Sequence, residues 1–182
     1  MTRLGLRGGL LATSSLVALV IGLQGSAEAA ACHYNNVAGG VDNTTAQDCI
    51  AYNGGGAFTG NVTNEATGSL TTTAPEGGPL PGTASGISVL APGTTLTGNI
   101  VNKGTITSNF VNINIGTGNF GTPPTSPGAG ATLNGSITNS GSLNVGVGSS
   151  GTTGISLSGT GSVVTGSITN DINGTITGEV SG

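Results

Sequence analysis

Cys32 and Cys49 are the only two cysteines in the chain, and they lie close together in the sequence. An even number of cysteines at short separation indicates a disulfide when the protein folds in an oxidising compartment. His33 and Asp48 adjoin them, which makes a metal site the alternative. Structural zinc takes four nitrogen or sulfur ligands, and the two cysteines and the single histidine supply three. We therefore predict a Cys32–Cys49 disulfide, no metal and no other cofactor.

Groups suited to catalysis are sparse in this chain. Serine is plentiful, but the single histidine, His33, lies in a predicted N-terminal loop and offers no nucleophile–base arrangement. Glycoside cleavage normally needs two facing carboxylates, whereas the acidic residues never share a repeat position. Beyond the N-terminal segment they are Asp42, Asp48, Glu65, Glu76, Asp171 and Glu179. We predict that the protein is not an enzyme, with a polysaccharide-active β-helix as a less favoured alternative.

The charge distribution excludes two classes of partner. Arg3 and Arg7 lie at the extreme N-terminus, and Lys103 is the only other basic residue. A single base cannot neutralise a run of phosphates, so we expect no binding to nucleic acid. The same reasoning excludes an anionic membrane surface.

The N-terminal segment has the pattern of a secretory signal peptide. Arg3 and Arg7 form its positive region, and residues 10–23 form an uncharged apolar region that is shorter than the roughly 20 residues needed to span a bilayer. Small residues follow, and cleavage fits after Ala29 or after Ala31. We predict a signal peptide over residues 1–29, with cleavage as late as residue 31, and export by the Sec route.

The mature chain that this cleavage would leave contains no apolar run long enough for a transmembrane helix. Cys32 directly follows two alanines, so lipidation of Cys32 is an alternative to the disulfide. Lipidation would leave Cys49 without a partner, and the residue at position 29 is Ala where a lipobox usually has Leu.

An internal repeat dominates the rest of the sequence. The motif apolar–Thr/Asn–Gly–Asn/Ser–Ile/Val occurs four times, starting near residues 58, 96, 133 and 164, with its glycines at Gly60, Gly98, Gly135 and Gly166. Each copy continues into an asparagine, at Asn64, Asn102, Asn139 and Asn170. A second short unit of Gly, Ser or Thr and an apolar residue then follows. Self-similarity at such a period is typical of solenoid proteins.

The repeat has a direct physical interpretation. Apolar residues at alternate positions in short stretches indicate strands with one buried face, and Gly and Asn between them favour sharp turns. One coil cannot bury its inward residues alone, but coils stacked about 4.8 Å apart can. Asn102, Asn139 and Asn170 would then line up at one corner, where stacked amides can bond as a ladder.

These observations predict an all-β fold, a repetitive right-handed β-solenoid with short strands that follows a cleaved signal peptide. We expect a cysteine-bracketed cap or loop over residues 30–57 and solenoid repeats over residues 58–182. Two coils of about 18 residues in each repeat would give about seven coils and a rod roughly 33 Å long. Proline-containing stretches at 72–83 and 119–131 would leave the coil as loops, and such loops often carry recognition on repeat scaffolds.

The runs at 97–106 and 165–170 resemble the passenger regions of bacterial autotransporters, the type V secretion proteins. That resemblance covers residues 58–182 and rests on the composition and spacing of the repeated motifs, and not on a diagnostic site. It implies a β-solenoid displayed at the cell surface and anchored by a C-terminal β-barrel, commonly with a role in adhesion. No barrel pattern is present in this sequence, and passengers of this family tend to lack cysteine.

The resulting functional hypothesis is an exported, non-catalytic, surface-displayed or secreted solenoid with a structural or adhesive role. Its partners would be a host or matrix surface, or other cells, together with the missing β-barrel translocator. The protein would reach the cell surface or the medium if a barrel is supplied, and the periplasm otherwise. The alternatives are a truncated or decayed autotransporter product without independent activity, and an ice-binding solenoid with threonine ladders.

Overall fold

The computed structural model describes residues 32–72, 85–116, 130–146 and 153–181. The predicted signal peptide, with Ala29 and Ala31, lies outside these residues. So do most of the two predicted proline-containing loops. Within the described residues the chain forms only strands and connecting turns, and every strand pair is parallel.

The strands form four sheets, each of which contains one strand from successive coils. Sheet A consists of β1 (Tyr34–Asn35), β4 (Ile50–Tyr52), β8 (Ser85–Leu90), β12 (Val111–Gly116), β16 (Thr153–Ser158) and β20 (Glu179–Ser181). Sheet B consists of β2 (Val41–Asn43), β6 (Val62–Asn64), β10 (Ile100–Asn102), β14 (Ile137–Asn139) and β18 (Ile168–Asn170). Sheet C consists of β3 (Ala46–Gln47), β7 (Ser69–Thr72), β11 (Thr105–Ser108), β15 (Ser142–Val145) and β19 (Thr175–Ile176). Sheet D consists of β5 (Ala57–Thr59), β9 (Thr95–Thr97), β13 (Thr132–Asn134) and β17 (Val163–Val164).

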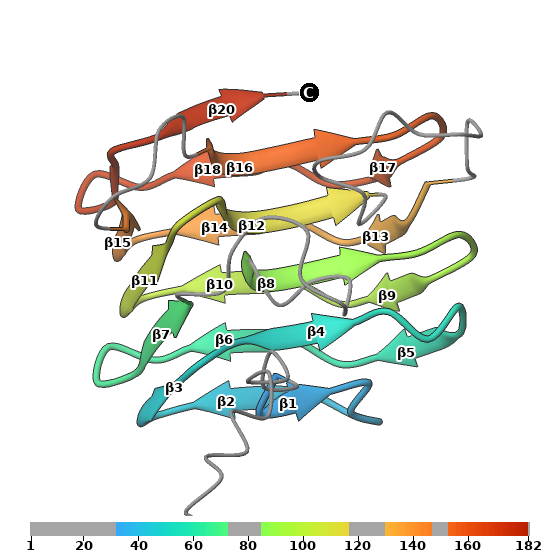
Figure 1. The fold of residues 1–182 in the computed structure, drawn as a ribbon, viewed down its shortest axis with the longest axis horizontal. Coiled ribbons are helices and arrows are strands. Elements are labelled where there is room, and N and C mark those ends of the chain that lie inside the picture. Colours follow the sequence, from blue (N-terminus) through green and yellow to red (C-terminus); the bar gives the residue numbers. More distant parts are fainter. Residues whose placement is uncertain (1–31, 73–84, 117–129, 147–152, 182) are drawn as a thin grey trace, which may run out of the picture.

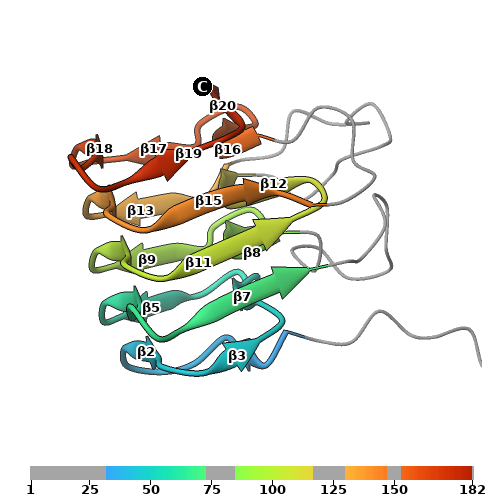
Figure 2. The same cartoon turned by 90° about the vertical axis from the view of Figure 1, so that its left-hand side faces the viewer.

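The chain passes through the sheets in the order A, D, B and C, and then returns to sheet A one level higher. Figures 1 and 2 show this path as a stack of similar layers that winds in a right-handed sense from β1 at one end to β20 at the other. The all-β, right-handed β-solenoid predicted from the sequence is therefore the fold of the described residues.

One repeat makes one coil, and the prediction of two coils in each repeat was wrong. Ile100 of β10 pairs with Val62 of β6 on one side and with Ile137 of β14 on the other, so a whole repeat separates neighbours. The second short unit of each repeat does not stack on the first, because it lies on sheet C of the same coil. Sheet A has six strands and hence five intervals, which gives a stack about 24 Å high in place of the rod of roughly 33 Å.

The solenoid also begins earlier than predicted. Residues 30–57 were expected to form a cap or loop, yet β1 pairs with β4, β2 pairs with β6 and β3 pairs with β7. The first coil is short because it passes from sheet A to sheet B without a strand in sheet D. Strands are possible here because Val41 and Ile50 supply inward-facing apolar side chains, and both are buried.

The core consists of columns of apolar side chains inside the stack. In sheet B the inward positions of the middle coils are Val62, Ile100 and Ile137, all with no exposed surface. Each fully buried side chain of this size contributes about 1.5–3 kcal/mol of hydrophobic stabilisation. The alternation of buried and more exposed residues in β10 and β14 follows from the two faces of a strand. Sheet A differs, because every residue of β8 and β12 is buried.

Candidate functional site

An asparagine ladder runs through the stack at the corner after sheet B. The Nδ2 of Asn64 donates a hydrogen bond to Oδ1 of Asn102 over 2.8 Å, and Asn102 donates to Asn139 over the same distance. One coil lower, Asn43 Nδ2 donates to Asn64 Oδ1 over 2.8 Å. In the uppermost described coil, Asn170 Oδ1 accepts from Asn139 Nδ2 over 2.7 Å. Because an amide carries both donors and acceptors, one residue type can pair with itself at every level.

The ladder is internal to the fold. Asn43, Asn64, Asn102 and Asn139 have no exposed surface, and a buried amide must be paired to avoid a free-energy cost of about 1–3 kcal/mol. Sequence reasoning placed Asn102, Asn139 and Asn170 at this corner. It missed Asn43 because the segment around β2 does not carry the repeat motif.

A second ladder joins the coils at the corner between sheets D and B. Here a side-chain oxygen accepts from a backbone N–H of the next coil: Asn61 Oδ1 from Asn99 at 2.9 Å, and Asn99 Oδ1 from Ser136 at 2.9 Å. Ser136 Oγ accepts from the Ser167 N–H at 3.1 Å. The Asn/Ser position of the motif is thus explained by an acceptor oxygen, a role that sequence reasoning did not assign.

The motif glycines form a column at this same corner. Gly60 and Gly98 have φ values of 132° and 150°, which side chains rarely adopt. Gly135 is required for a different reason, because a β-carbon there would collide with the carbonyl oxygen of Gly98 in the coil below. A β-carbon at Gly166 would meet the Ser136 hydroxyl first and then the Gly135 carbonyl oxygen at 2.6 Å. The predicted turn glycines therefore also permit close stacking of the backbones.

The outward face of sheet C is an uncharged surface of hydroxyl and amide side chains, which we call the hydroxyl face. It consists of two columns, one made of Ser69, Thr105, Ser142 and Thr175 and the other of Thr71, Thr107, Asn144 and Thr177. All eight are partly or fully exposed. Neighbouring hydroxyls in a column can bond, as Thr175 Oγ1 does with Ser142 Oγ at 3.1 Å.

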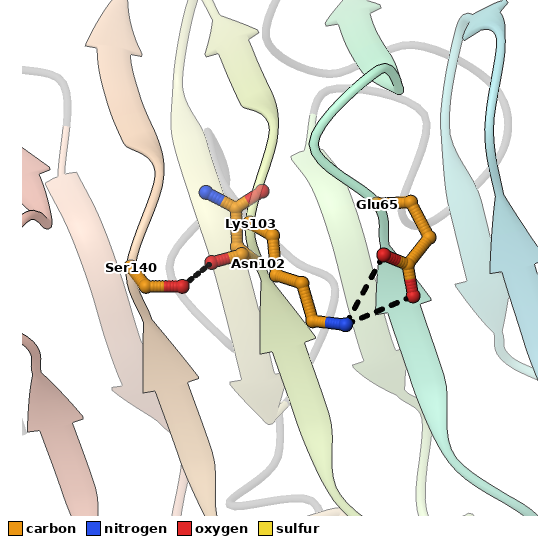
Figure 3. Close-up of polar contacts among 4 residues, drawn as sticks. All are labelled: Glu65, Asn102, Lys103 and Ser140. Carbon is orange, nitrogen blue, oxygen red and sulfur yellow. Dashed lines mark hydrogen bonds and ion pairs between the residues drawn. The ribbon is translucent and has the colours of Figure 1, made fainter.

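An ion pair lies at the edge of this surface, at the corner that follows the asparagine ladder. Lys103 Nζ contacts both carboxylate oxygens of Glu65 in the coil below, at 3.0 and 3.1 Å. Figure 3 shows this ion pair beside Ser140, whose hydroxyl donates to the Asn102 carbonyl at 3.3 Å. Both charged side chains are substantially exposed, so the pair contributes little to stability.

The cysteines form the predicted disulfide between the first two levels of sheet A. Asp48 lies beside it and accepts hydrogen bonds from the backbone N–H groups of His33 and Cys49, both at 2.8 Å. His33 stacks edge-on against Tyr34. The Asp48 carboxylate therefore serves as a hydrogen-bond acceptor for the backbone. The described residues hold no cluster of three or more potential metal-ligating side chains.

Tyr52 is the largest fully buried side chain and packs against Phe58, with 5.1 Å between ring centroids. Burial raises the pKa of its phenol above the usual value. Among the described residues, its hydroxyl has no hydrogen-bond partner. This residue therefore belongs to the core and not to a reactive site.

Among the described residues no helix is long and apolar enough to cross a membrane. Comparison of the whole chain with family models, with curated proteins and with solved structures gave no match. The functional interpretation therefore rests on the fold and on the surfaces that it presents.

Proposed function

We propose that this protein is an exported, non-catalytic β-solenoid with a structural or adhesive role, similar to an autotransporter passenger. The observation that supports this proposal best is the hydroxyl face on sheet C. It repeats one kind of side chain at regular intervals on a scaffold held by two ladders and a continuous core.

The chemistry of the hydroxyl face suits an uncharged, hydroxyl-bearing partner. Along each strand the two columns lie about 6.7 Å apart, and successive coils lie about 4.8 Å apart. Hydroxyl and amide groups can donate and accept hydrogen bonds, and a repeated array can engage a repeated partner at several points at once. Neutral polysaccharide on a matrix or a cell surface fits these requirements.

Export is tested by expressing the full chain in a Gram-negative host and by locating it in cell fractions. The proposal expects residues 1–29 or 1–31 to be removed and the product to leave the cytoplasm. A matched variant with Arg3 and Arg7 replaced by Glu should retain the precursor in the cytoplasm. An uncleaved, cytoplasmic wild-type product would contradict the proposal.

Adhesion is tested by measuring adsorption of the purified chain to insoluble neutral polysaccharide and to matrix-coated surfaces. We expect Thr107→Lys to lower adsorption about tenfold, because a buried unpaired charge is costly at the centre of an uncharged contact. Thr97→Lys, on the exposed face of sheet D, is the matched control and should adsorb like the wild type. Equal adsorption of both variants would exclude the hydroxyl face as the adhesive surface.

An ice-binding role is a second candidate, supported by the columns of hydroxyl side chains on the same face. β11 has Thr at both outward positions, and the run from Thr175 of β19 to Thr177 repeats this pattern, whereas β7 and β15 have Ser or Asn at one or both. A thermal-hysteresis measurement decides between the two, because the adhesive proposal expects no hysteresis.

A further inference from the structure

A hollow lies beside the disulfide, at the corner where the chain passes from sheet C of the first coil to sheet A of the second. Its volume of about 440 Å³ is within the range of small-ligand pockets. Only Asp48 and Cys49 connect β3 to β4 here, so the disulfide ties down this wall of the hollow. The described residues that line it are His33, Ala46, Gln47, Asp48 and Thr71.

The hollow continues the hydroxyl face. Gln47 of β3 is paired with Leu70 of β7, and the next residues along the two segments are Asp48 and Thr71. Thr71 belongs to the second column of the hydroxyl face, in which Thr107 is its neighbour in the coil above. Figure 2 shows β3 and β7 as the two lowest strands of sheet C, with the rest of the face above them. A partner that lies along this column and extends past Thr71 therefore reaches the Asp48 carboxylate.

The Asp48 carboxylate is held in place with one oxygen left for a ligand. Its Oδ1 accepts from the backbone N–H groups of His33 and Cys49, both at 2.8 Å, and the disulfide fixes the segments that carry these donors. Among the residues that the structure describes, Oδ2 has no hydrogen-bond or ion-pair partner. A carboxylate oxygen is a strong acceptor for a hydroxyl donor, because the hydrogen bond is charge-assisted.

The other groups that line the hollow suit an uncharged ligand with several hydroxyls. Gln47 Nε2 donates to Thr45 Oγ1 at 3.0 Å, which orients an amide that offers both donors and an acceptor. The Thr71 hydroxyl donates and accepts, and the His33 imidazole supplies a nitrogen donor. In the described part of the chain no basic residue lines the hollow, so an anionic ligand would face the carboxylate without a compensating charge. Adjacent hydroxyls of a sugar ring match this set of donors and acceptors.

We propose that this hollow is a sugar-binding subsite, which holds one unit of a neutral polysaccharide that lies along the hydroxyl face. The inference rests on the proposed adhesive function and adds a specificity-determining residue to it. Asp48 accepts from the hydroxyls of the bound unit through Oδ2, while Gln47 and Thr71 hydrogen-bond the remaining hydroxyls. This unit makes a charge-assisted contact, whereas the units above it meet the neutral side chains of the hydroxyl face.

The probes are three uncharged hexasaccharides, namely cellohexaose, maltohexaose and laminarihexaose, titrated into the isotope-labelled, disulfide-bonded full chain. Nuclear magnetic resonance follows the backbone amide signals. We expect saturable shifts of the His33 and Cys49 amides, which donate to Asp48, with at least one of the three sugars. Absence of these shifts with all three would overturn the proposal.

The same titration with glucose and glucosamine distinguishes a sugar site from a cation site. Both have the hydroxyls of a sugar ring, but glucosamine also carries an ammonium group that a carboxylate attracts. We expect glucose to shift the His33 and Cys49 amides. Shifts with glucosamine and none with glucose would show that the hollow binds cations, and the proposal would fail.

Asp48→Asn tests the carboxylate, because it keeps an oxygen acceptor for the backbone and replaces the second oxygen by an amide nitrogen. It should weaken hexasaccharide binding about tenfold. Asp42→Asn makes the same change of charge on the exposed side of β2 and should bind within about twofold of wild type. Thermal unfolding checks that both variants fold. Wild-type affinity of Asp48→Asn, or equal weakening by the two variants, would exclude the proposed role of Asp48.

Thr71→Val provides a second test that leaves the corner itself untouched. It removes one hydroxyl from the hollow and should weaken hexasaccharide binding about threefold. Thr97→Val, on the exposed side of sheet D, is its control and should bind like the wild type. Equal affinities of these two variants would contradict the proposed contact of Thr71 with the sugar.

Adsorption of the wild type to insoluble neutral polysaccharide separates this inference from the adhesive proposal. Adsorption with hexasaccharide shifts confined to Thr107 and its neighbours on the hydroxyl face would exclude the subsite and leave the adhesive role intact. Shifts of the His33 and Cys49 amides without adsorption to any polysaccharide or matrix would support the subsite and contradict the adhesive role.

Discussion

The side-chain amide of Asn102 lies 2.8 Å from the side-chain oxygen of Asn139, although 37 residues separate them in the chain. Asn102 also accepts a hydrogen bond from Asn64 in the coil below, so it is a donor on one side and an acceptor on the other. Each inner rung of the ladder therefore joins three successive coils. Loss of one such residue should remove hydrogen bonds to the coil above and to the coil below.

We expect Asn102→Ala to lower the free energy of unfolding by about 2–4 kcal/mol. It removes both amide–amide hydrogen bonds of this rung and leaves the amides of Asn64 and Asn139 incompletely paired, at about 1–3 kcal/mol for each group. The measurement is urea denaturation followed by circular dichroism. Asn134→Ala, an exposed amide on sheet D, should change the free energy by less than about 0.5 kcal/mol. Equal effects of the two substitutions would show that the ladder does not stabilise the fold.

Substitution of Gly135 by Ala should destabilise the stack by about 1–3 kcal/mol. The added methyl group would meet the Gly98 carbonyl oxygen, which is backbone and cannot move aside as a side chain can. Gly56→Ala is the matched control, since its β-carbon would make only ordinary contacts with Phe58 at 3.8 and 3.9 Å. Chemical denaturation of both variants measures the change in the free energy of unfolding. If Gly135→Ala leaves that free energy unchanged, close backbone contact is not the reason for the glycine column.

The buried phenol of Tyr52 should titrate above the usual range of a tyrosine. Burial raises the folded-state pKa of Tyr52, so the folded protein holds this proton more tightly than the unfolded chain does. The resulting stabilisation is complete below the unfolded pKa of about 10 and is lost as the pH rises through the folded pKa. Absorbance at alkaline pH, compared in wild type and Tyr52→Phe, measures it. A titration step of Tyr52 at the ordinary tyrosine pKa of about 10 would contradict the prediction.

Tyr52→Phe should also stabilise the protein at neutral pH, by about 1 kcal/mol. The substitution removes a buried hydroxyl that has no hydrogen-bond partner in the described part of the chain, and it keeps the ring packed on Phe58. Thermal unfolding at pH 7 tests this, and a lower melting temperature than wild type would mean that the hydroxyl is paired in solution.

Removal of the disulfide should cost about 3 kcal/mol, because it closes a loop between residues 17 apart in sequence. Cys32→Ser with Cys49→Ser is compared with wild type by denaturation, with and without reductant. Reductant should lower the stability of wild type to that of the double variant and leave the variant unchanged. No effect of reductant on the wild type would show that the bridge contributes nothing.

The sequence predicted the stacking but not the number of strands in a coil. Leu96 to Ile100 and Gly104 to Ile106 look like two similar units, and similar units were expected to lie on top of each other. In the structure they lie on different sheets of the same coil, since Ile106 pairs with Leu70 and Leu143. A period in a sequence fixes which residues are equivalent, but it does not fix how many corners the chain turns between them.

The first coil was missed for a related reason. Val41 and Asn43 occupy the same positions as Ile100 and Asn102, but the preceding Thr-Gly-Asn signal is absent. Asn61 and Asn99 were interpreted as turn residues, because a sequence pattern cannot distinguish a residue that favours a turn from one whose oxygen receives a neighbour's N–H. The hydroxyl face likewise emerges only when the strands of sheet C are placed side by side.

Since Ile100 and Ile137 are neighbours across one full turn, the gene for this protein can lengthen in whole layers. A tandem duplication of residues 96–132 would add one strand to each of the four sheets, stacked in parallel on the strand that it copies. Such a change would add one coil in the middle of the solenoid and leave the first and last described coils unchanged. Evolution can thus vary the height of this scaffold by simple recombination, while its cross-section stays the same.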